Sequence, residues 1–482
     1  MSNWLKKNIL SRPIAFHPIL FAAFPALFLY AYNVSVTATE HLFVPLTLSV
    51  LGTVCLWMLL GLITRDMRKA ALAATLLVIL FFSYGRLYEA LESWNIFVPK
   101  HAYLLSVVLF AWGYCVYFIK KSRRDFKNVT LILNIVATAL VAINLFNIGW
   151  YEFSKPRLNQ ESMAQTDNQT FSDNTTGMES MPDIYLIVLD EFAHHSTMEK
   201  YYGYYNDVFL QAFRDKGFYI SNGSTTRTGN TVYSIASTLN MEYIGPDQPV
   251  AAVYKQIADN KVVEFLRSRG YKYIYFGSWF DYGKYRIDAD QYYNYYQGDT
   301  WVAEFSQIFW NTTMLRPFSN RISGTQASLY YRNGLLNTVY KMETSVDAPG
   351  PKFVFAHIMC PHAPYIIGSN GEFVDPSNWY NYRDKQYYRG QYDYILHRIY
   401  SAVNNIISNS TRPPIIIIQS DHGLKSSHPG INVGQNEWEK ILNMYYFPGE
   451  AKSALYDNVS PADSFRLIFN QYFHAGLPLL KD

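Results

Sequence analysis

Five long apolar segments near the start of the chain constrain its fold more than any other feature. Each is close to the ~20 residues that an α-helix needs to cross the hydrocarbon core of a bilayer. The segments cover residues 14–34, 42–64, 70–87, 101–119 and 129–149. Five buried helices of a soluble protein would not require basic residues to alternate between the connecting stretches, as they do here. We therefore predict an α-helical membrane domain with five transmembrane helices.

Basic residues indicate which way this membrane domain is oriented. Three clusters precede the first segment, separate the second from the third, and separate the fourth from the fifth. These clusters contain Lys6, Lys7 and Arg12; Arg65, Arg68 and Lys69; and Lys120, Lys121, Arg123, Arg124 and Lys127. Because positively charged loops stay in the cytoplasm, the N-terminus is expected there. Five crossings would then place everything after Trp150 on the other side of the membrane.

Composition bounds the remainder of the chain. With 482 residues, of which 49% are hydrophobic, the chain can form more than one domain with a large core. A formal net charge of +3 gives no indication of nucleic-acid binding. We predict a membrane domain over residues 1–150, a polar linker over 151–181 and an extracytoplasmic catalytic domain over 182–482. Cys360 is the only cysteine of that last domain, so no disulfide can form within it, and we interpret it as a small buried hydrophobic residue.

Strand and helix patterns alternate in the outer domain. Apolar, β-branched or aromatic runs predict strands, and apolar residues at helical spacing predict helices. The expected strands cover residues 183–189, 218–220, 271–276, 353–359, 415–418 and 442–447. The expected helices cover residues 207–216, 261–269 and 391–408. Such alternation predicts an α/β domain with a mostly parallel sheet and helices on both faces.

Two of these strands end in side chains that can bind a metal. Asp421 and His422 follow the isoleucine strand, and Asp190 and Glu191 follow the first strand. Strand ends of a parallel sheet meet at one edge, where ligands bind. Carboxylates and a neutral imidazole favour one divalent ion such as zinc, manganese or magnesium. A polar turn after a core strand, or a helix N-cap at Asp190, would explain each pair separately.

A hydroxyl nucleophile is offered by the Ser/Thr/Gly/Asn-rich segment 221–241. Thr231 stands where this loop becomes a helix, and a helix N-terminus stabilises an incoming phosphate or sulfate. A nearby cation would lower the pKa of the hydroxyl. A simple N-cap role for Thr231 fits the local sequence equally well.

Histidines near a further strand end complete the set of candidates. FAHIMCPHAPY places His357, His362 and Tyr365 there, with His362 in a loop flanked by prolines. We expect His362 to act as a general acid or to bind an anion, and His357 and Tyr365 to contact substrate. His428 is a weaker substrate-binding candidate.

In this order the motifs resemble the alkaline phosphatase/sulfatase superfamily. The matching pieces are the strand-terminal Asp190, the loop hydroxyl Thr231, PHAPY around His362, and SDHG with Asp421 and His422. The resemblance covers about residue 182 to the C-terminus. It implies a metal-dependent phosphate- or sulfate-ester enzyme that forms a covalent intermediate on the loop hydroxyl.

The five apolar segments sharpen the resemblance toward lipoteichoic acid synthases and lipid A phosphoethanolamine transferases, which carry a threonine nucleophile. Formylglycine sulfatases need a Cys/Ser-x-Pro-x-Arg motif, and the loop around Thr231 has none. Unlike those transferases, which usually have glutamate as first metal ligand, this chain offers Asp190 or Glu191. Asp190 closes the strand and is therefore the preferred ligand.

The resemblance implies a phosphotransferase in a bacterial inner (plasma) membrane. One divalent ion on Asp190, Thr231, Asp421 and His422, with Glu191 as a possible further ligand, would activate Thr231. Thr231 would take a phospho-alcohol headgroup from a membrane lipid donor, and an envelope lipid or polysaccharide would accept it. Two alternatives stay open: a hydrolase or phosphodiesterase of envelope esters, and a catalytically silent envelope-assembly protein. The oligomeric state is not predicted.

Overall fold

The computed structural model describes residues 14–34, 37, 39–93, 100–154, 181–278, 288–295, 304–374, 384–425 and 433–480. The chain divides into two compact units. A helical unit contains residues 1–168 and 298–326, and a sheet unit contains residues 169–297 and 327–482. Each unit has its own core and is described separately.

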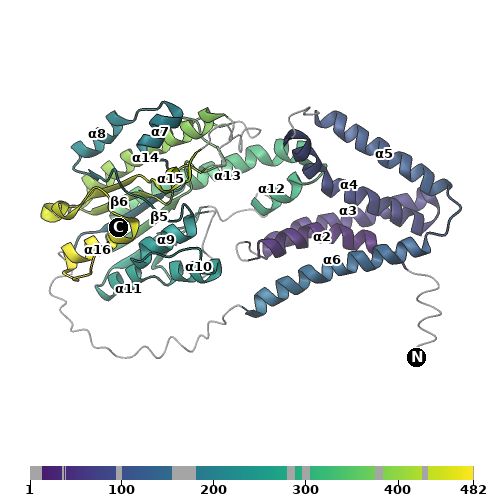
Figure 1. Cartoon of the computed structure of the whole chain (residues 1–482), viewed down its shortest axis with the longest axis horizontal. Coiled ribbons are helices and arrows are strands. Elements are labelled where there is room, and N and C mark those ends of the chain that lie inside the picture. The colour runs from purple at the N-terminus through teal and green to yellow at the C-terminus, as the bar shows by residue number, and fades with distance from the viewer. Residues whose placement is uncertain are drawn as a thin grey trace. The chain divides into compact units, whose positions relative to one another are not determined.

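Five helices from the first part of the chain form most of the helical unit (Figure 1). They are α2 (His17–Tyr32), α3 (Glu40–Thr64), α4 (Met67–Ser93), α5 (His101–Lys121) and α6 (Lys127–Ser154). Among the described residues, α3 to α6 are long and apolar enough to cross a membrane, whereas α2 has 16 residues. At 1.5 Å per residue, α2 is about 24 Å long, shorter than a ~30 Å hydrocarbon core. Four of the five expected spans therefore have spanning length, and together these helices indicate a membrane anchor.

The helical unit also contains a segment from much later in the sequence. This segment comprises α12 (Glu304–Asn311) and the start of α13 (Arg316–Thr344). The expected division, with one outer domain from residue 182 onward, does not anticipate it. The pattern of residues 304–311 indicates an apolar helix face but not which helices it packs against.

The sheet unit is built on a seven-stranded sheet with the order β2-β7-β6-β1-β5-β3-β4. The strands are β1 (Ile184–Leu189), β2 (Tyr219–Ile220), β3 (Lys272–Phe276), β4 (Gln291–Tyr293), β5 (Lys352–Ile358), β6 (Ile415–Ser420) and β7 (Asn443–Tyr446). The five strands from β6 to β4 are parallel, and β7 is antiparallel to both β6 and β2. The prediction of a mostly parallel α/β sheet is thus confirmed.

Helices cover both faces of this sheet (Figure 1). One face carries α9 (Thr231–Asn240), α10 (Val250–Ala258), α11 (Lys261–Ser268) and α16 (Pro461–Phe473). The other carries α7 (His195–Tyr202), α8 (Asp207–Asp215) and α14 (Lys385–Asn409). Shorter elements are the five-residue α15 (Gln435–Glu439) and the 3₁₀ helices η3 (Ser345–Asp347) and η5 (Gly449–Ala454). Helices on both faces explain why β1 and β6 read as continuous apolar runs, since both are buried throughout.

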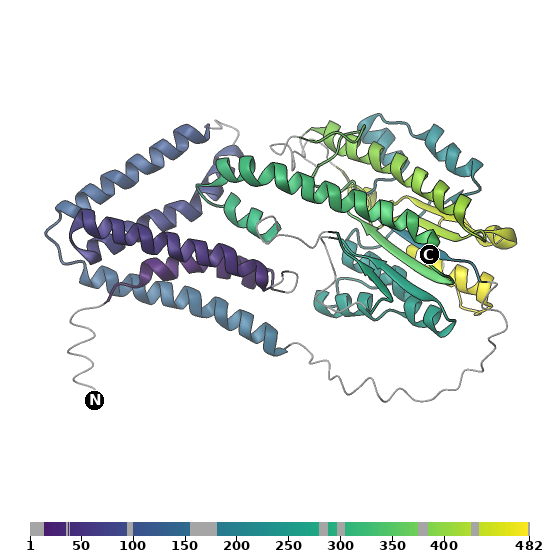
Figure 2. The same cartoon turned by 180° about the vertical axis from the view of Figure 1, so that it is seen from behind.

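The helices of the two layers lie close to their expected positions in the sequence. Asn230, Asn260 and Ser460 cap α9, α11 and α16 by accepting hydrogen bonds from backbone N–H groups. On the opposite face, α14 lies beside the end of α13, where Arg398 and Glu343 form an ion pair of 2.8 Å (Figure 2). The expected helix at 391–408 in fact begins six residues earlier, at Lys385, after the capping residue Asp384.

Parallel pairing fixes which side chains stand next to each other at the end of the sheet. Val188 in β1 lies opposite His357 in β5 and Gln419 in β6. Gln419 donates a hydrogen bond of 3.0 Å to Thr238 of α9, so this row of residues faces the α9 layer. The register therefore places the polar residues that follow β1 and β6 side by side, next to His357.

Candidate metal centre

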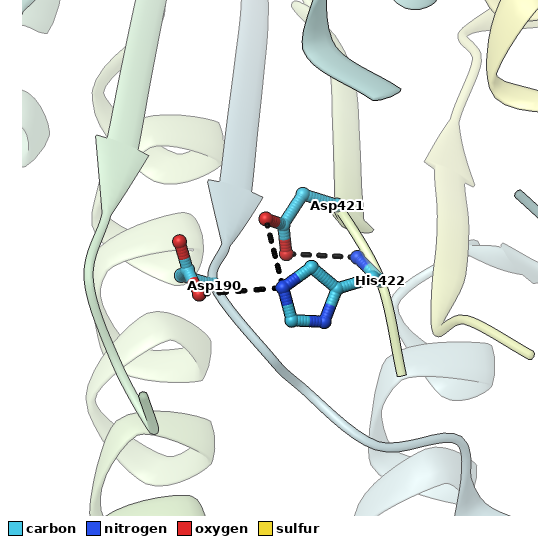
Figure 3. Close-up of side chains that lie close together, drawn as sticks. All are labelled: Asp190, Asp421 and His422. Carbon is cyan, nitrogen blue, oxygen red and sulfur yellow. Dashed lines mark hydrogen bonds and ion pairs between the residues drawn. The ribbon is translucent and has the colours of Figure 1, made fainter. Parts of the chain in front are cut away.

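Asp190, Asp421 and His422 come together at the carboxyl edge of the sheet, as the sequence predicts (Figure 3). One possible ligand atom from each residue lies within 4.8 Å of the other two. Asp190 directly follows β1, and Asp421 and His422 directly follow β6. Because β1 and β6 are adjacent and parallel, both strand ends deliver their side chains to one place.

The three facing atoms have no hydrogen-bond partner among the described residues. They are Oδ1 of Asp190, Oδ2 of Asp421 and Nε2 of His422, and all three are buried. A buried polar atom without a partner is costly, most of all on a carboxylate. Two carboxylate oxygens and one imidazole nitrogen suit a divalent cation, so this donor set fits a metal ion.

Other atoms of the same side chains are held by the backbone. Oδ1 of Asp421 accepts hydrogen bonds from the N–H groups of Glu191 at 3.0 Å and His422 at 2.8 Å. Nδ1 of His422 lies 2.8 Å from the carbonyl oxygen of Gly423 and must donate to it. Nε2 of His422 is therefore the unprotonated nitrogen in the neutral ring, and its lone pair is free for a cation.

Asp190 is held by a histidine beneath it. Nε2 of His357 lies 3.2 Å from Oδ2 of Asp190, and donates to that carboxylate. Burial alone would raise the pKa of Asp190. The nearby His362 and the hydrogen bond from His357 outweigh burial and hold the pKa of Asp190 well below its usual range. Asp190 is thus ionised at neutral pH, as a metal ligand must be.

Ser420 links the two strand ends that carry the candidate ligands. Its hydroxyl donates toward the backbone carbonyl oxygens of Leu189 and His422, at 3.1 and 2.6 Å, and accepts from the N–H of Phe192 at 3.0 Å. This network fixes the spacing between the first and second ligand loops. The sequence analysis did not single out Ser420, although it belongs to the SDHG motif.

The structure does not place Glu191 in the ligand group. Its backbone N–H donates to Asp421, and its Oε1 accepts a hydrogen bond of 3.3 Å from the N–H of Lys425. Glu191 has a positive φ of 56°, so the chain turns sharply immediately after Asp190. This turn separates the directions of the two acidic side chains, and Asp190 is the one that faces His422.

Thr231 is the first residue of α9, but Asn230 is its N-cap. Oδ1 of Asn230 accepts from the N–H of Val232 at 3.1 Å. The alternative that Thr231 serves as the cap is therefore wrong. Gly229, two residues before Thr231, lies close to Trp438, since a Cβ at Gly229 would lie 3.2 Å from the Trp438 side chain. The carbonyl oxygen of Trp438 accepts a hydrogen bond of 2.7 Å from the N–H of Gly423.

The loop before Thr231 and the loop after His422 consequently pack on the same residue, Trp438. Further from the carboxyl edge of the sheet, the hydrogen bond from Gln419 to Thr238 connects β6 to α9. Thr231 is buried at the N-terminus of α9, where backbone N–H groups and the helix dipole favour an anion. The placement suits a nucleophile that acts on a phosphate or sulfate ester.

A pocket of about 280 Å³ opens beside the start of α9. Its lining mixes hydroxyl-bearing side chains with apolar ones. The hydroxyls belong to Thr225, Thr226, Thr228, Ser234, Ser237 and Tyr243, and the apolar residues include Ile244, Pro246, Pro461 and Ala462. The guanidinium of Arg227 stacks 3.6 Å above the ring of Tyr243. Such a mixed lining, apolar with a few polar groups, is typical of a small-molecule pocket.

His362 lies in the loop after β5, next to the backbone of Asp190. Its N–H donates to the carbonyl oxygen of Asp190 at 3.2 Å, and its Nδ1 donates to the carbonyl oxygen of Ala363. Burial lowers the pKa of His362, but Asp190 and Glu191 together raise it above its usual value. His362 is only half-buried, so its position suits the expected role in anion binding or acid catalysis.

Gln391 of α14 fixes the loop that carries His362, and the sequence analysis missed it. Its Oε1 accepts from the N–H groups of Ile366 and Ile367 at 2.7 and 3.3 Å. Its Nε2 donates to the carbonyl oxygens of Pro361 and His362 at 3.2 and 3.1 Å. The signal in the sequence is its spacing, because Gln391 lies four residues before Ile395 and so continues the apolar stripe of this helix with a polar residue.

Two further candidates need correction. The sequence predicts that His357 and Tyr365 contact substrate, but both side chains are completely buried. His357 supports Asp190, and Tyr365 packs at a ring distance of 6.5 Å against Tyr388 of α14. Each therefore has a structural or positioning role. His428 lies outside the described residues. Cys360 is buried with a pKa raised by burial and by Asp190, which agrees with the expected hydrophobic role.

Residues 182–458, more than half of the chain, match the family profile described as Sulfatase. The chain belongs to the sulfatase family. The resemblance to the alkaline phosphatase/sulfatase superfamily is thereby confirmed, and the ligand-bearing strand ends of this sulfatase-family chain lie within the matched range. A comparison with curated proteins finds no match.

Solved structures with similarity to this sulfatase-family chain include the following three. The zinc complex of the periplasmic domain of EptC from Escherichia coli is 14% identical, covers 62% of this chain and 88% of its own, and gives a TM-score of 0.40. The corresponding domain of the phosphoethanolamine transferase EptC from Campylobacter jejuni is 12% identical, with coverage of 61% and 90% and a TM-score of 0.38. The lipoteichoic acid synthase LtaP from Listeria monocytogenes is 14% identical, with coverage of 56% and 66% and a TM-score of 0.36.

Proposed function

We propose that this chain is a membrane-bound, metal-dependent phosphotransferase. It would move a phospho-alcohol headgroup from a lipid donor to an envelope lipid or glycopolymer. The observation that carries the proposal is the convergence of three unpartnered ligand atoms from Asp190, Asp421 and His422 at the sheet edge. Helices of membrane-spanning length in the same chain give such a centre access to lipid esters.

Asp190, Asp421 and His422 would hold one zinc, manganese or magnesium ion, with Thr231 as a further ligand. Once bound, the ion supplies a Lewis acid that favours the alkoxide of Thr231 and neutralises charge on the phosphoryl group. The N–H groups at the start of α9 would bind the phosphoryl oxygens. His362 would give a proton to the departing alcohol and take one from the incoming alcohol.

In the first step, Oγ1 of Thr231 attacks phosphorus and the bond from phosphorus to the diacylglycerol oxygen breaks. The threonine proton leaves to solvent or a neighbouring base, and the released diacylglycerol oxygen gains a proton from His362. In the second step, the hydroxyl of the acceptor attacks the phosphothreonine. Its proton passes to His362, and the Thr231 oxygen is released and reprotonated.

The experiment is a covalent trap with the full-length protein in phospholipid vesicles. Labelled phosphatidylglycerol and phosphatidylethanolamine serve as donors, and mass spectrometry locates the transferred group. We expect the label on Thr231 in the wild type, no label in Thr231→Ala, and partial activity in Thr231→Ser. Thr228→Ala tests the position of the nucleophile: Thr228 lies three residues earlier in the same loop and lines the pocket, so the rate can change but the label should stay on Thr231. Label on another residue, or full activity of Thr231→Ala, would contradict the assignment of the nucleophile.

A hydrolase is the second candidate, because the matched family is named for hydrolysis of sulfate esters. Water would then replace the acceptor alcohol in the second step. The same vesicles distinguish the two, since transfer makes a new labelled lipid or glycan and hydrolysis releases a free labelled phospho-alcohol. A sulfate-ester substrate tested in parallel identifies sulfatase activity directly.

We also propose that the sheet unit lies outside the cytoplasm, on the periplasmic or extracellular face of a bacterial inner membrane. The basic clusters on the expected cytoplasmic side support this orientation. The shorter helix α2 makes the number of crossings the critical point. An alkaline phosphatase reporter fused after Asp482 should be active, and a cytoplasmic reporter at the same site should be active only if the orientation is wrong.

A further inference from the structure

A stretch of chain that lies between β4 and β5 in the sequence returns to the helices of the membrane anchor. We name residues 304–318 the return segment; it contains α12 and the first residues of α13. It belongs to the helical unit, while the strands on either side of it in the sequence belong to the sheet unit. The metal centre does not explain why these residues belong to the helical unit, so a separate role is expected for the return segment.

Helix α12 lies beside α2 and α3 (Figure 1). Phe305 and Phe309 are buried together with Leu27 and Tyr30 of α2 and Leu42 of α3. Rings of Tyr30 and Phe305 lie 6.5 Å apart, in an edge-to-face arrangement. This is core packing between side chains four residues apart on α12 and the ends of α2 and α3.

Backbone hydrogen bonds attach the next residues to α4. The N–H of Gly85 donates to the carbonyl oxygen of Thr312 at 2.8 Å, and the N–H of Met314 donates to the carbonyl oxygen of Phe81 at 3.0 Å. Phe81 and Gly85 are four residues apart, so the return segment bonds to both ends of one helical turn. A Cβ at Gly85 would lie 2.3 Å from the carbonyl oxygen of Asn311, so only glycine permits this approach.

An ion pair and a cation–π contact also attach the return segment to the end of α4. The guanidinium of Arg316 lies 2.9 Å from Oε1 of Glu89 and 5.2 Å from the centre of the Tyr88 ring. Met314 is buried against Tyr84 of α4. Packing, backbone bonds and charge therefore all hold the segment on the last turns of α4.

These turns lie at the far side of the expected membrane. Gly85 is 18 residues after Met67, the first residue of α4, which follows a basic cluster assigned to the cytoplasm. At 1.5 Å per residue that is about 27 Å, close to the ~30 Å thickness of the hydrocarbon core. Tyrosine and tryptophan are the residues expected at such an interface, and Tyr88 and Trp310 occur here.

Apolar side chains of the return segment remain uncovered by protein. Ile308 is 43% exposed, Leu315 42% and Phe318 54%. The segment that carries them is bonded to α4, which exposes apolar side chains of its own, Ile79 and Leu87, on either side of Gly85 in the sequence. Acyl chains, rather than water, are the natural cover for such side chains at that depth.

We propose that the return segment is a lipid-binding surface at the extracytoplasmic face of the inner membrane. There, Ile308, Leu315 and Phe318 contact phospholipid acyl chains. It would hold a lipid next to the point where the chain leads through α13 back to the sheet unit. Only the consequence for turnover rests on the proposed lipid donor. Lipid contact itself can be tested without any enzymatic activity.

The direct test uses full-length protein in vesicles that contain a phospholipid with a photoreactive group near the start of one acyl chain. After irradiation, mass spectrometry maps the labelled peptides. We expect label on residues 304–318 as well as on α3 to α6. Label on the membrane helices alone would overturn the proposal, whatever the result of the activity assays.

One set of variants tests the attachment of the return segment to α4, and a second set tests its exposed apolar side chains. Gly85→Leu should displace the segment and remove its label, whereas Gly113→Leu on α5 should not, because a Cβ there meets no atom within 4 Å. Ile308→Ser with Leu315→Ser and Phe318→Ser changes only exposed side chains, and folding should persist. This triple variant should lose label on the segment by at least about tenfold, since each lost apolar contact weakens lipid binding.

Turnover separates this inference from the proposed function. In the triple variant we expect slower reaction of a phospholipid in vesicles and an unchanged rate with a small soluble phosphodiester. If no phospholipid reacts in the wild type, the donor is wrong but photolabelling still decides the lipid surface. Equal loss with both substrates in the triple variant would contradict a role in lipid presentation.

Discussion

Nε2 of His357 lies 3.2 Å from Oδ2 of Asp190, and both side chains are almost completely buried. The pair joins β5 to the end of β1, the strand that supplies the first candidate ligand. His357 leaves the other oxygen of Asp190 directed toward His422 and Asp421. Partners of this kind fix the orientation and charge of a metal ligand without touching the ion.

Replacing His357 should weaken metal binding more than folding. His357→Leu removes the donor to Asp190, and we expect a loss in metal affinity of about 10- to 100-fold. His357→Gln retains an N–H donor and should restore part of it. Competition with a chelator measures the affinity of the full-length protein in detergent. His397→Leu, an exposed histidine of α14, is the control. Unchanged affinity in His357→Leu would show that Asp190 does not depend on this partner.

Asp421→Asn should remove the metal but keep the loop. The amide oxygen can replace Oδ1, which accepts from the N–H groups of Glu191 and His422, while the NH₂ group takes the place of the free oxygen. We expect bound metal to fall from one equivalent to nearly none, and turnover to fall by more than the ~10- to 100-fold typical of an outer partner.

Asp421→Asn should weaken metal binding but should not destabilise the metal-free protein. Without metal, two carboxylates lie close together at the site, so removing one charge should leave the chelator-treated protein at least as stable as the wild type. Metal should raise the melting temperature of the wild type and not that of Asp421→Asn. Asp215→Asn, at an exposed position of α8, is the control. A metal-dependent rise that persists in Asp421→Asn would argue against Asp421 as a ligand.

Sequence patterns could predict the ligand-bearing edge because it follows from local rules. Apolar runs that end in Asp190 and in Asp421–His422 identify buried parallel strands, and parallel strands deliver their ends to one edge. Only the three-dimensional neighbours decide the rest. Strand alternation alone cannot tell whether His357 faces substrate or supports Asp190. Likewise, Phe305 and Phe309 indicate an apolar face on α12 but not that membrane helices cover it.

Glu437 gives a pH-dependent prediction outside the metal centre. Its carboxylate accepts hydrogen bonds from Thr197 at 2.6 Å and Lys200 at 3.0 Å, and lies 3.3 Å from Lys440. Burial raises the pKa of Glu437, but Thr197 and the two lysines together lower it below its usual value. A lowered pKa means that the ionised form stabilises the fold at pH above the unfolded value, about 4.5.

This stabilisation is lost as the pH falls through the lowered pKa. Glu437→Gln should therefore reduce the melting temperature at pH 7, with a cost of about 1–3 kcal/mol for hydrogen bonds to a charged group. The difference from the wild type should shrink below about pH 4.5. Glu264→Gln, at an exposed position of α11, should show no such trend. A difference that stays constant from pH 7 to pH 4 would contradict the assigned role of the charge.

Two serines of α9 line the pocket at the start of this helix, and they allow a matched test of that pocket. Ser234 is 2% exposed, lines the pocket, and its hydroxyl has no hydrogen-bond partner among the described residues. Ser237 lines the same pocket, but its hydroxyl donates to the carbonyl oxygen of Tyr233 at 2.7 Å and accepts from the N–H of Ile244 at 2.9 Å.

Removing an unpartnered buried hydroxyl relieves a desolvation cost, whereas removing a partnered one creates such a cost. Ser234→Ala should therefore leave the free protein equally stable or more stable, by up to about 1 kcal/mol. Ser237→Ala should destabilise it by about 1–3 kcal/mol, because the N–H of Ile244 loses its acceptor. If the alcohol part of the substrate occupies the pocket, Ser234→Ala should also raise KM. Melting temperatures without substrate, and KM with kcat for the same donor, measure the two effects separately. An equal loss of stability in both variants would mean that Ser234 has a partner in the folded protein, and an unchanged KM would place the substrate elsewhere.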